Sequence, residues 1–336
     1  MIARRALAGL AAALTLAGCG DGLDRAGAPD TIRFSILNTE NSQTSQQYWA
    51  PVLADMEKAT GLQVKPYFQS NYTGLIEAMR FKQTDVGWFS NQSGLEAVRR
   101  AGGEVFARTT DPSGVDGYYS VLIVPARSNL TLDDVLKCDK SLTFGIGDAK
   151  STSGTLAPMT YLFAPRNIDP KQCFKTVRSA NHQANLFAVA RGVLDVATNN
   201  TTGMRLNLER GEEEARQVKI IWRSPVLPED PIVYRKDLDP AVKEKLRQFF
   251  LTYGREGPDA ERQRANLVAL SIGGFLPADD THLLPVREME ATETLLRARA
   301  DGDPGEIEKA ERDLAAIRQQ RIDAAGKAGQ PLMPVP

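Results

Sequence analysis

Hydrophobic and polar positions alternate along the chain first with the period of a strand and then with that of a helix. Residues 31–38 alternate at every second position and are rich in β-branched side chains, which predicts a strand. Residues 42–60 repeat apolar positions at three- and four-residue steps, which predicts a helix capped by Thr44 or Ser45 and ended by Gly61. The apolar face of this helix consists of Tyr48, Trp49, Val52, Leu53 and Met56.

The same succession of strands and helices continues through most of the chain. We expect further strands at 62–68, 86–89, 118–125, 142–145, 174–178, 193–197, 219–222 and 230–234. We expect further helices at 72–82, 93–101, 130–136, 156–163 and 240–253. Strands that alternate with helices predict mostly parallel sheets that are covered by helices on both faces.

The pattern predicts an α/β fold of two lobes joined by a hinge of two chain segments. The chain is expected to leave the first lobe near residues 124–126 and to return near residues 228–231. The first lobe then comprises residues 31–125 and 231–284, and the second lobe comprises residues 126–230. A chain of roughly 300 residues is long enough to give each lobe its own core.

Residues 285–336 have a different character and are predicted to be a C-terminal helical extension. Two charged helices are expected at 288–300 and 306–325, separated by the Asp-Gly-Asp-Pro-Gly turn at 301–305. The second helix carries an apolar stripe of Ile307, Ala310, Leu314 and Ile317. This stripe can pack on the body of the protein, or it can pair with a second copy and give a homodimer through the C-terminal helices.

The amino terminus has the layout of a bacterial secretory signal. Arg4 and Arg5 precede an apolar run at residues 6–17, which is about half the length that spans a bilayer. Residues 1–18 are therefore expected to be a signal peptide. The signal ends in Leu-Ala-Gly-Cys at residues 16–19, which resembles the bacterial lipobox, in which the cysteine is lipidated. The alternative is an ordinary signal peptide followed by an incidental cysteine.

Lipidation of Cys19 would anchor the mature protein to a membrane, in the periplasm or at the cell surface. Residues 19–30 are rich in glycine, alanine and aspartate, so they are expected to form a flexible tether. No later apolar run has the length of a membrane-spanning helix. The net charge of −1 gives no electrostatic basis for binding nucleic acid.

The remaining cysteines, Cys138 and Cys173, are expected to form a disulfide, because exported proteins fold under oxidising conditions. The alternative is a pair of buried free thiols. The two histidines, His182 and His282, are far apart in the sequence and give no ligand spacing with these cysteines. We therefore expect no metal site.

The serine-rich segment Ser151-Thr152-Ser153-Gly154 is the main candidate for binding chemistry. It lies between a predicted strand and an apolar segment that can be helical. Unpaired backbone N–H groups at a helix start favour an anion, and three hydroxyl groups add uncharged donors. The alternative is that these residues only cap a helix. The segment lacks the pattern of a Walker A loop.

His182 lies at a second junction between a predicted strand and a helix, among the polar residues 179–185. Its imidazole can donate a hydrogen bond to an anion if this junction faces the same cleft as the serine segment. A structural or solvated histidine is the alternative. No nucleophile–base arrangement stands out in the sequence, so catalysis is not expected.

Several segments, taken in order, closely resemble the periplasmic phosphonate-binding proteins of ABC importers. The similarity extends from about residue 32 to residue 285. The motifs that carry it are Asn-Tyr-Thr-Gly-Leu-Ile-Glu-Ala-Met-Arg-Phe at 71–81, Val-Leu-Ile-Val at 121–124, Leu-Thr-Phe-Gly at 142–145, Ser-Thr-Ser-Gly at 151–154, Asp-Val-Ala-Thr-Asn-Asn-Thr at 195–201 and Asp-Pro-Ile-Val at 230–233.

The resemblance implies a type II periplasmic-binding fold, in which two lobes close on the ligand. It implies that the phosphonate oxygens are held by Ser151, Thr152, Ser153 and His182. It also implies that Tyr72 and Tyr118 reach in from the first lobe, and that Asp230 at the hinge meets the amino group of an aminoalkyl phosphonate.

The sequence departs from the family pattern at Thr202. The family member with an aminoethylphosphonate pocket has a glutamate directly after the Asn-Asn-Thr run, and the residue here is uncharged. Losing one carboxylate weakens an ammonium contact, since a charge-assisted hydrogen bond is worth roughly 1.5–3 kcal/mol. A phosphonate with a smaller or uncharged tail, phosphite and phosphate thus become as plausible as an amine.

These inferences predict a solute-binding lipoprotein that captures a phosphonate-like small anion and delivers it to an ABC permease of the inner membrane. One alternative is a binding subunit that senses the same ligand for a membrane signalling protein. Another is a phosphoester hydrolase that uses the same anion cradle, although no nucleophile–base pair supports it.

Overall fold

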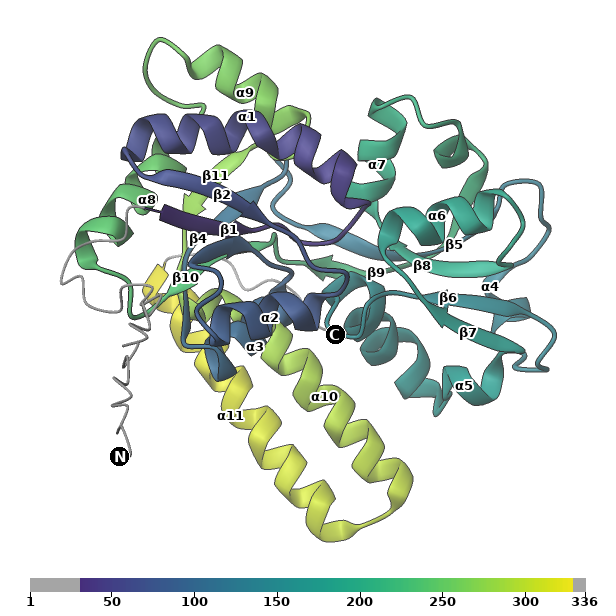
Figure 1. Cartoon of the computed structure of the whole chain (residues 1–336). Helices are drawn as coiled ribbons and strands as arrows, with labels where there is room; N and C mark the ends of the chain where they lie inside the picture. The colour runs from purple at the N-terminus through teal and green to yellow at the C-terminus, as the bar shows by residue number, and fades with distance from the viewer. Residues whose placement is uncertain (1–30, 329–336) are drawn as a thin grey trace, which may run out of the picture.

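The computed structural model describes residues 31–328, which form two α/β lobes and a helical hairpin (Figure 1). The predicted signal peptide, the tether with Cys19 and the last eight residues, 329–336, lie outside the described residues. The two-lobe α/β class with C-terminal helices is confirmed. Within residues 31–328, no helix combines the length and the apolar character needed to cross a membrane.

The first lobe contains a six-stranded sheet in the order β11-β4-β10-β3-β1-β2. Its strands are β1 (Thr31–Ser35), β2 (Gln63–Tyr67), β3 (Val86–Trp88), β4 (Gly103–Thr110), β10 (Pro231–Arg235) and β11 (Gly274–Pro277). Strand β1 pairs in parallel with β2 and β3, whereas β10 pairs antiparallel with β3 and β4. The prediction of a mostly parallel sheet is wrong here, because the chain returning from the second lobe runs opposite to β3. The sequence pattern also missed β4 and β11.

The second lobe contains a five-stranded sheet in the order β7-β6-β8-β5-β9. Its strands are β5 (Tyr118–Pro125), β6 (Thr143–Ile146), β7 (Thr176–Ser179), β8 (Val196–Asn200) and β9 (Val218–Leu227). Strand β5 pairs antiparallel with β8 and β9, so the predicted lobe boundary at residue 125 is wrong. The chain crosses first between β4 and β5 and returns between β9 and β10. A fully buried strand has the same hydrophobic pattern in either lobe. Hydrophobicity alone therefore could not assign β5 to one of the two lobes.

Helices cover both faces of the first sheet. They are α1 (Ser42–Thr60), α2 (Tyr72–Arg80), α3 (Asn91–Arg100), α8 (Pro240–Thr252) and α9 (Ala260–Val268). Helix α1 has the predicted bounds and ends at Gly61, whose positive φ of 68° suits glycine. Its cap is Asn41, which accepts a hydrogen bond from the Thr44 N–H at 2.9 Å. The predicted cap, Thr44 or Ser45, is therefore wrong by one turn.

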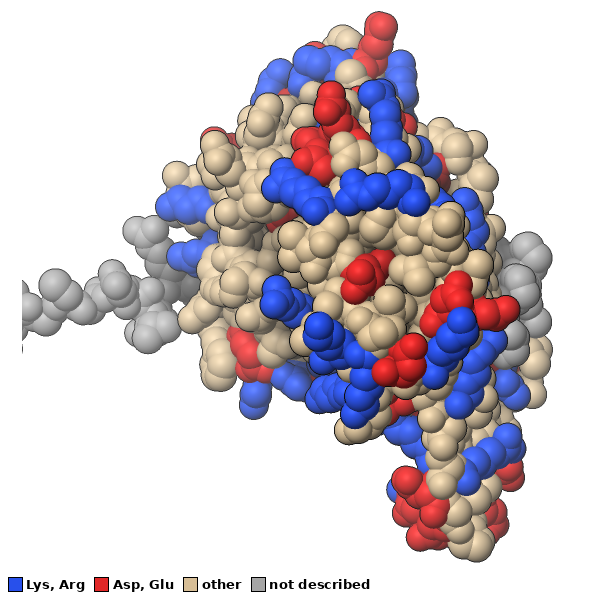
Figure 2. Space-filling model, turned by 90° about the vertical axis from the view of Figure 1, so that its right-hand side faces the viewer, with Lys and Arg blue, Asp and Glu red and all other residues tan. Residues whose placement is uncertain are grey.

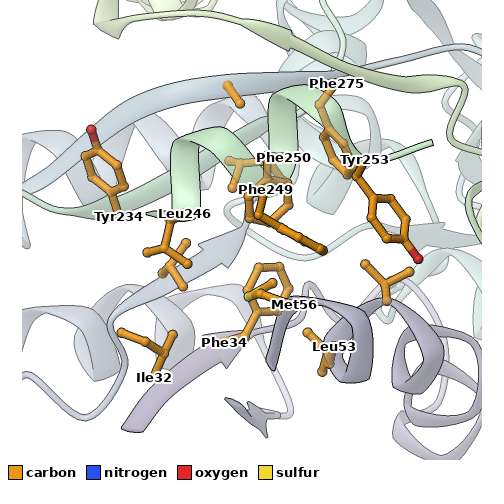
Figure 3. Packing of buried hydrophobic residues seen from close by; sticks show 14 of the residues in the cluster. Ile32, Phe34, Leu53, Met56, Tyr234, Leu246, Phe249, Phe250, Tyr253 and Phe275 are labelled. Atoms are coloured by element: carbon orange, nitrogen blue, oxygen red, sulfur yellow. The ribbon is translucent and has the colours of Figure 1, made fainter. Parts of the chain in front are cut away.

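An aromatic core holds α1 and α8 on the first sheet (Figure 3). Ile32 and Phe34 of β1 face Leu53 and Met56 of α1, and the ring of Phe250 from α8 packs on the same cluster. The Phe250 ring lies 6.1 Å from the ring of Phe34 and 4.8 Å from that of Phe275, measured between centroids. Each such buried side chain contributes about 1.5–3 kcal/mol, so the first lobe is a firmly packed support for its side of the pocket.

The second lobe contains the helices α4 (Leu132–Val135), α5 (Pro170–Cys173), α6 (His182–Ala190) and α7 (Thr201–Glu209). The segment predicted as a helix at 156–163 instead begins at Thr152, as two π-helical turns, η1 (Thr152–Leu156) and η2 (Met159–Phe163). Figure 2 shows the end of the molecule that this lobe forms, where basic and acidic side chains are interspersed among uncharged ones.

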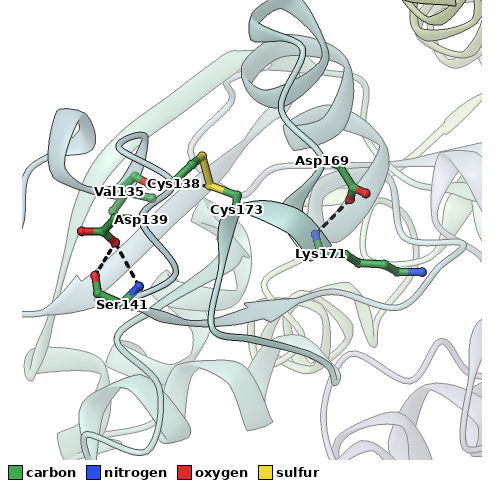
Figure 4. The surroundings of a disulfide bond; sticks show 7 residues. All are labelled: Val135, Cys138, Asp139, Ser141, Asp169, Lys171 and Cys173. Carbon is green, nitrogen blue, oxygen red and sulfur yellow. Dashed lines mark hydrogen bonds between the residues drawn. A yellow bond between two sulfur atoms is a disulfide. The ribbon is translucent and has the colours of Figure 1, made fainter.

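Cys138 and Cys173 form a disulfide that joins the turn after α4 to the end of α5 (Figure 4). Hydrogen-bonded turns flank both cysteines. Asp139 accepts from the Ser141 N–H at 2.9 Å, and Asp169 accepts from the Lys171 N–H at 2.9 Å. The disulfide therefore closes a 35-residue separation at the periphery of the second lobe, among residues that do not line the pocket.

The C-terminal helices α10 (Leu284–Asp301) and α11 (Pro304–Ala328) form an antiparallel hairpin that extends away from both sheets (Figure 1). The apolar stripe of α11 packs on α10, where Ala310 and Leu314 bury against Leu295. Glu288 of α10 pairs with both Arg318 and Arg321 of α11. The stripe thus packs on the neighbouring helix of the C-terminal extension, and not on the body of the protein as the first alternative had it.

Candidate ligand-binding site

A pocket of about 70 Å³ lies between the lobes, where strand ends and helix starts of both lobes meet. Seven of the eight predicted binding residues line it: Tyr72, Tyr118, Ser151, Ser153, His182, Thr202 and Asp230. A single water needs about 10–15 Å³ of such space, so the pocket has room for about five to seven heavy atoms. This size fits one small ligand.

Ser151 and Ser153 belong to a cradle at the start of the π-helical turn η1. The turn packs directly on the end of β6, because the Gly147 N–H donates to the Gly154 carbonyl at 2.9 Å. A β-carbon on Gly147 would lie 2.4 Å from the α-carbon of Gly154, so both positions need glycine. Ser151 caps the turn by accepting from the Gly154 N–H at 3.0 Å. The first N–H groups of the turn have no carbonyl partner within it, which favours an anion.

His182 is the first residue of α6, and its side chain is almost fully buried in the cradle. The Nε2 atom lies 3.4 Å from the hydroxyl oxygen of Ser151 and 3.4 Å from that of Ser153. The Nδ1 atom is buried without a hydrogen-bond partner. Burial lowers the pKa of the imidazole to about 4, so His182 is neutral at pH 7. Two helix starts that are far apart in the sequence therefore present uncharged donors to one point.

A layer of buried polar side chains behind the cradle fixes its shape. Ser120 donates to the Ser153 carbonyl at 2.6 Å, and Thr198 donates to the Gly154 carbonyl at 2.7 Å. Asn199 donates to the His182 carbonyl at 2.8 Å, and Asn200 donates to the Ser153 hydroxyl at 3.3 Å. No role for these residues had been predicted from the sequence. The available signal was a run of three polar residues, 198–200, on a strand that is otherwise apolar.

Thr152 does not line the pocket, and the expectation that its side chain meets the ligand is not supported. Its hydroxyl accepts a hydrogen bond from the Gln92 N–H of α3 at 2.9 Å. The Ser90 hydroxyl next to it donates to the Lys150 carbonyl at 2.9 Å. Both bonds join the first lobe to the second. Thr152 therefore helps to hold the lobes together, because α3 occupies the side of η1 on which its hydroxyl lies.

A second group of inter-lobe contacts involves α6 and α7. Arg210, at the end of α7, pairs with Glu40 of the first lobe at 2.5 Å, and both side chains are buried. The Arg210 guanidinium also lies 3.7 Å from the centre of the Tyr48 ring. Gln183 of α6 donates through its N–H to the Thr39 carbonyl at 3.1 Å. With the lobes touching at these points, the structure is in a closed arrangement.

Two buried tyrosines line the pocket, Tyr72 from the first lobe and Tyr118 from the start of β5 in the second lobe, so the expectation that Tyr118 reaches in from the first lobe is wrong. Tyr72 begins α2, and its N–H donates to Asp148 of the second lobe at 3.1 Å. The Tyr118 hydroxyl donates to Asp230 at 3.4 Å. Burial raises the pKa of both phenols well above the usual value, and the negative charge of Asp230 raises each further. Both phenols therefore remain protonated and are hydrogen-bond donors.

Two adjacent carboxylates, Glu229 and Asp230, lie in the return crossing and line the pocket. Asp230 accepts only from neutral groups, at 3.4 Å from the Asn91 amide and 3.4 Å from the Tyr118 hydroxyl. Burial raises the pKa of Asp230 well above its usual value and that of Glu229 to about 7. The residues that line the pocket include no lysine or arginine. Glu229 lines the pocket together with Trp88, Gln183 and Asn207, and none of these four was predicted as a binding residue from the sequence.

The chain is similar to known proteins in both sequence and fold. The pattern of the family described as "ABC transporter, phosphonate, periplasmic substrate-binding protein" matches residues 34–283. The chain belongs to this family. It is 42% identical to the phosphonates-binding periplasmic protein of Escherichia coli K12, over 77% of this chain and 75% of that protein.

Solved structures of family members share the fold. A binding-protein component of an ABC phosphonate transporter from Pseudomonas aeruginosa is 40% identical, with a TM-score of 0.83, and the match covers 89% of this chain and 99% of that one. A Prochlorococcus marinus binding protein in complex with methylphosphonate is 20% identical, with a TM-score of 0.68 over 78% and 97% of the two chains. The fold is therefore the type II periplasmic-binding fold predicted from the sequence, and the chain is a substrate-binding component of an ABC importer.

Proposed function

We propose that this protein binds the phosphonate head group of a small ligand in the inter-lobe pocket and delivers the ligand for import. The observation that carries this proposal is the convergence of His182 on Ser151 and Ser153 at the start of η1. Hydroxyl, imidazole and backbone N–H donors suit a tetrahedral oxyanion, and they bind it without a fixed positive charge. Membership of the phosphonate-binding family supports the same head group.

Binding proceeds by closure of the two lobes. In an open form the cradle faces solvent and the ligand docks on the second lobe first. Closure then brings Tyr72 of the first lobe over the ligand, and it forms the contacts of Arg210 with Glu40 and of Gln92 with Thr152. Excluding water strengthens each of these polar contacts. The closed form, which alone carries both lobes in contact, is the form that a permease of the inner membrane would recognise.

The Leu-Ala-Gly-Cys sequence at residues 16–19 supports a lipid anchor on Cys19. The mature protein would then be tethered to a membrane by residues 19–30, in the periplasm or at the cell surface. Anchoring keeps the protein close to its permease, which raises the effective concentration of one for the other. Mass spectrometry of the mature protein tests this directly, through the mass of the acylated amino-terminal peptide and its loss in Cys19→Ala.

The proposed role is binding without bond cleavage. The Ser151–His182 contact has the composition of a nucleophile and its base. A catalytic histidine is oriented by a third group on its other nitrogen, whereas the Nδ1 atom of His182 is buried without a partner. The contact is thus better suited to holding an anion than to activating a hydroxyl.

A thermal-shift panel tests the proposal as a whole. Methylphosphonate, 2-aminoethylphosphonate, phosphite, phosphate and sulfate are each added over a wide concentration range. A ligand stabilises the folded state by about 2.7 kcal/mol at 100 times its dissociation constant, so true ligands raise the melting temperature in a concentration-dependent way. At least one phosphonate should do so and sulfate should not. If none of the phosphorus compounds raises the melting temperature, the proposed function is wrong.

A further inference from the structure

Asp148 of the second lobe bonds to both lobes at once. It lies in the turn between β6 and η1, directly before the cradle. Its Oδ1 atom accepts from the Lys150 N–H at 2.8 Å, which shapes the turn within the second lobe. Its Oδ2 atom accepts from the Tyr72 N–H of the first lobe at 3.1 Å. The two oxygens of one carboxylate therefore join the cradle turn to a first-lobe residue that lines the pocket.

The main chain of Asp148 is bonded to the cradle itself. Its carbonyl accepts from the Ser151 N–H at 2.9 Å and from the Thr155 hydroxyl at 2.8 Å. Both donors belong to the start of η1. A shift of the cradle therefore also shifts the Asp148 carboxylate, so its position follows that of the residues proposed to bind the oxyanion.

The partner of Asp148 in the first lobe is the amino-terminal end of helix α2. Tyr72 is the first residue of this helix, and the first turn contains no acidic residue of its own. The cap residue Asn71 accepts from the Gly74 N–H at 2.8 Å, so the Tyr72 N–H has no partner within the helix. A carboxylate at a helix start is favourable because it complements the helix dipole. Helix α2 receives this carboxylate from the opposite lobe, and only while the lobes are in contact.

The side chain of Tyr72 reaches from this helix start to the pocket. It is fully buried and lines the pocket. Burial raises the pKa of its phenol well above the usual value, and the neighbouring Ser151 side chain lowers it in part. The phenol is thus a neutral donor beside the cradle. Any movement of the start of α2 would also move this donor.

Two other contacts of the same turn join it to helix α3 and do not involve Asp148. The Ser90 hydroxyl donates to the Lys150 carbonyl at 2.9 Å, and the Lys150 ammonium lies 3.5 Å from the Glu96 carboxylate. These contacts do not depend on the Asp148 side chain. Losing its carboxylate should therefore affect the position of Tyr72 more than the docking of the turn on the first lobe.

We propose that Asp148 is a positioning residue that holds Tyr72 over the bound head group when the lobes close. The inference rests on the proposed function, because it concerns how the same site retains its ligand. In the open form the ligand docks on the cradle while Asp148 has no contact with α2. Closure brings the start of α2 to Asp148, and the bond then holds the Tyr72 phenol beside the oxyanion. Asp148 should therefore slow the release of the ligand and leave its association unchanged.

Asp148→Asn separates this role from that of the turn. The asparagine oxygen can still accept from the Lys150 N–H, but the amide nitrogen cannot accept from the Tyr72 N–H. Stopped-flow mixing with methylphosphonate, or with 2-aminoethylphosphonate if only that phosphonate binds, can be followed by tryptophan fluorescence, because Trp88 lines the pocket. The release rate should rise about tenfold, since a charge-assisted hydrogen bond is lost, and the association rate should change less than about twofold.

Asp139→Asn is the matched control. Asp139 closes the same kind of turn in the second lobe, where it accepts from the Ser141 N–H at 2.9 Å, and it does not line the pocket. The control should leave both rates unchanged. If Asp148→Asn releases the ligand as slowly as the wild type does, or if its loss of affinity comes from slower association, the assignment of Asp148 is wrong.

A double-mutant cycle with Tyr72→Phe shows whether Asp148 acts through Tyr72. This substitution removes the phenol oxygen and keeps the backbone N–H. The release rate of the double variant should be at least about threefold lower than the product of the two single effects predicts, because both changes affect the same donor. Single effects that multiply fully would overturn the proposal. If no phosphonate, phosphite or phosphate binds the wild-type protein, the proposed function itself is wrong.

Discussion

The Nε2 atom of His182 lies 3.4 Å from the hydroxyl oxygen of Ser151, across a sequence separation of 31 residues. One residue begins helix α6 and the other caps the π-helical turn η1. The contact exists because β6 and β7 are parallel neighbours in the sheet, so the segments that follow them, η1 and α6, begin at the same edge. Two helix starts converge in this way, and an oxyanion between them meets donors from both.

Ser151→Ala should weaken the binding of methylphosphonate about ten- to hundredfold, since it removes a hydroxyl donor to a charged oxygen. Thr152→Ala should weaken it less, by about fivefold, because the Thr152 hydroxyl bonds to Gln92 and not to the ligand. Calorimetric titration of both variants measures the difference. Ser141→Ala, at an exposed turn of the same lobe, is the control and should bind as the wild type does. An equal loss in Ser151→Ala and Thr152→Ala would contradict this distinction.

Acid should destabilise the ligand-free protein through His182. Its pKa is lowered to about 4 in the folded state, so between about pH 6.5 and pH 4 the unfolded chain binds the extra proton. The contribution of the neutral imidazole to the free energy of unfolding is fully present above pH 6.5. It falls by about 3 kcal/mol as the pH drops from 6.5 to 4. Urea unfolding at pH 7 and pH 4.5 should show that His182→Gln loses less unfolding free energy between these two pH values than the wild type does. An identical pH dependence would show that the imidazole is not buried as described.

Much of the fold followed from local patterns, whereas the assembly of the sheets did not. The helix at 42–60 and its glycine stop were readable because amphipathic spacing and capping are local properties. The assignment of β5 to the second sheet depends on pairing with β8 and β9, and no local pattern encodes it. The antiparallel pairing of β10 in the first sheet was not predicted, for the same reason.

The same distinction holds for the site, where some residues could be predicted from the local sequence and others only from the tertiary structure. Ser151 and Ser153 could be inferred from the serine-rich helix start, whereas Thr152 could not be separated from them, because a π-helical turn changes which side chains face the pocket. Glu229 was missed because an acidic residue beside a proline-flanked crossing resembles an ordinary turn. Its place in the pocket lining comes from the path of the return crossing, which only the tertiary structure provides.

Glu229 should make the ligand-free protein less stable as pH rises. Its folded pKa of about 7 exceeds the ordinary value near 4.5, so the folded state holds the proton longer than the unfolded chain. The contribution of Glu229 to the free energy of unfolding is largest below pH 4.5. About 3 kcal/mol of it is lost as the pH rises past 7. Glu229→Gln should remove that loss, which unfolding at pH 5 and pH 8 can measure.

Arg210→Met should favour the open form. The substitution leaves Glu40 without its partner in the closed arrangement, where both side chains are buried, and such a loss typically costs about 3–5 kcal/mol. Affinity for every phosphonate that the wild-type protein binds should fall about tenfold or more. Small-angle scattering with saturating ligand reports closure independently. Arg191→Met, which removes an exposed ion pair with Glu214 on the same lobe, should have little effect.

Removing the disulfide should reduce stability and leave recognition intact. Cys138 and Cys173 close a 35-residue separation, and neither residue lines the pocket. The paired variant Cys138→Ala/Cys173→Ala should lose about 2–4 kcal/mol of unfolding free energy. At a temperature where the variant remains folded, its dissociation constant for methylphosphonate should match that of the wild type. A changed ligand preference in the variant would show that the disulfide shapes the pocket.

Calorimetric titration of the wild-type protein and of Ser151→Ala/Ser153→Ala with methylphosphonate at pH 7 tests most directly whether the cradle binds the oxyanion. The wild type should bind one molecule per chain, and the double variant should lose most of that affinity while its circular dichroism spectrum is unchanged. The Ser151 and Ser153 hydroxyls lie within 3.4 Å of His182, so they form the centre of the proposed cradle. Unchanged binding in a folded double variant would contradict the account.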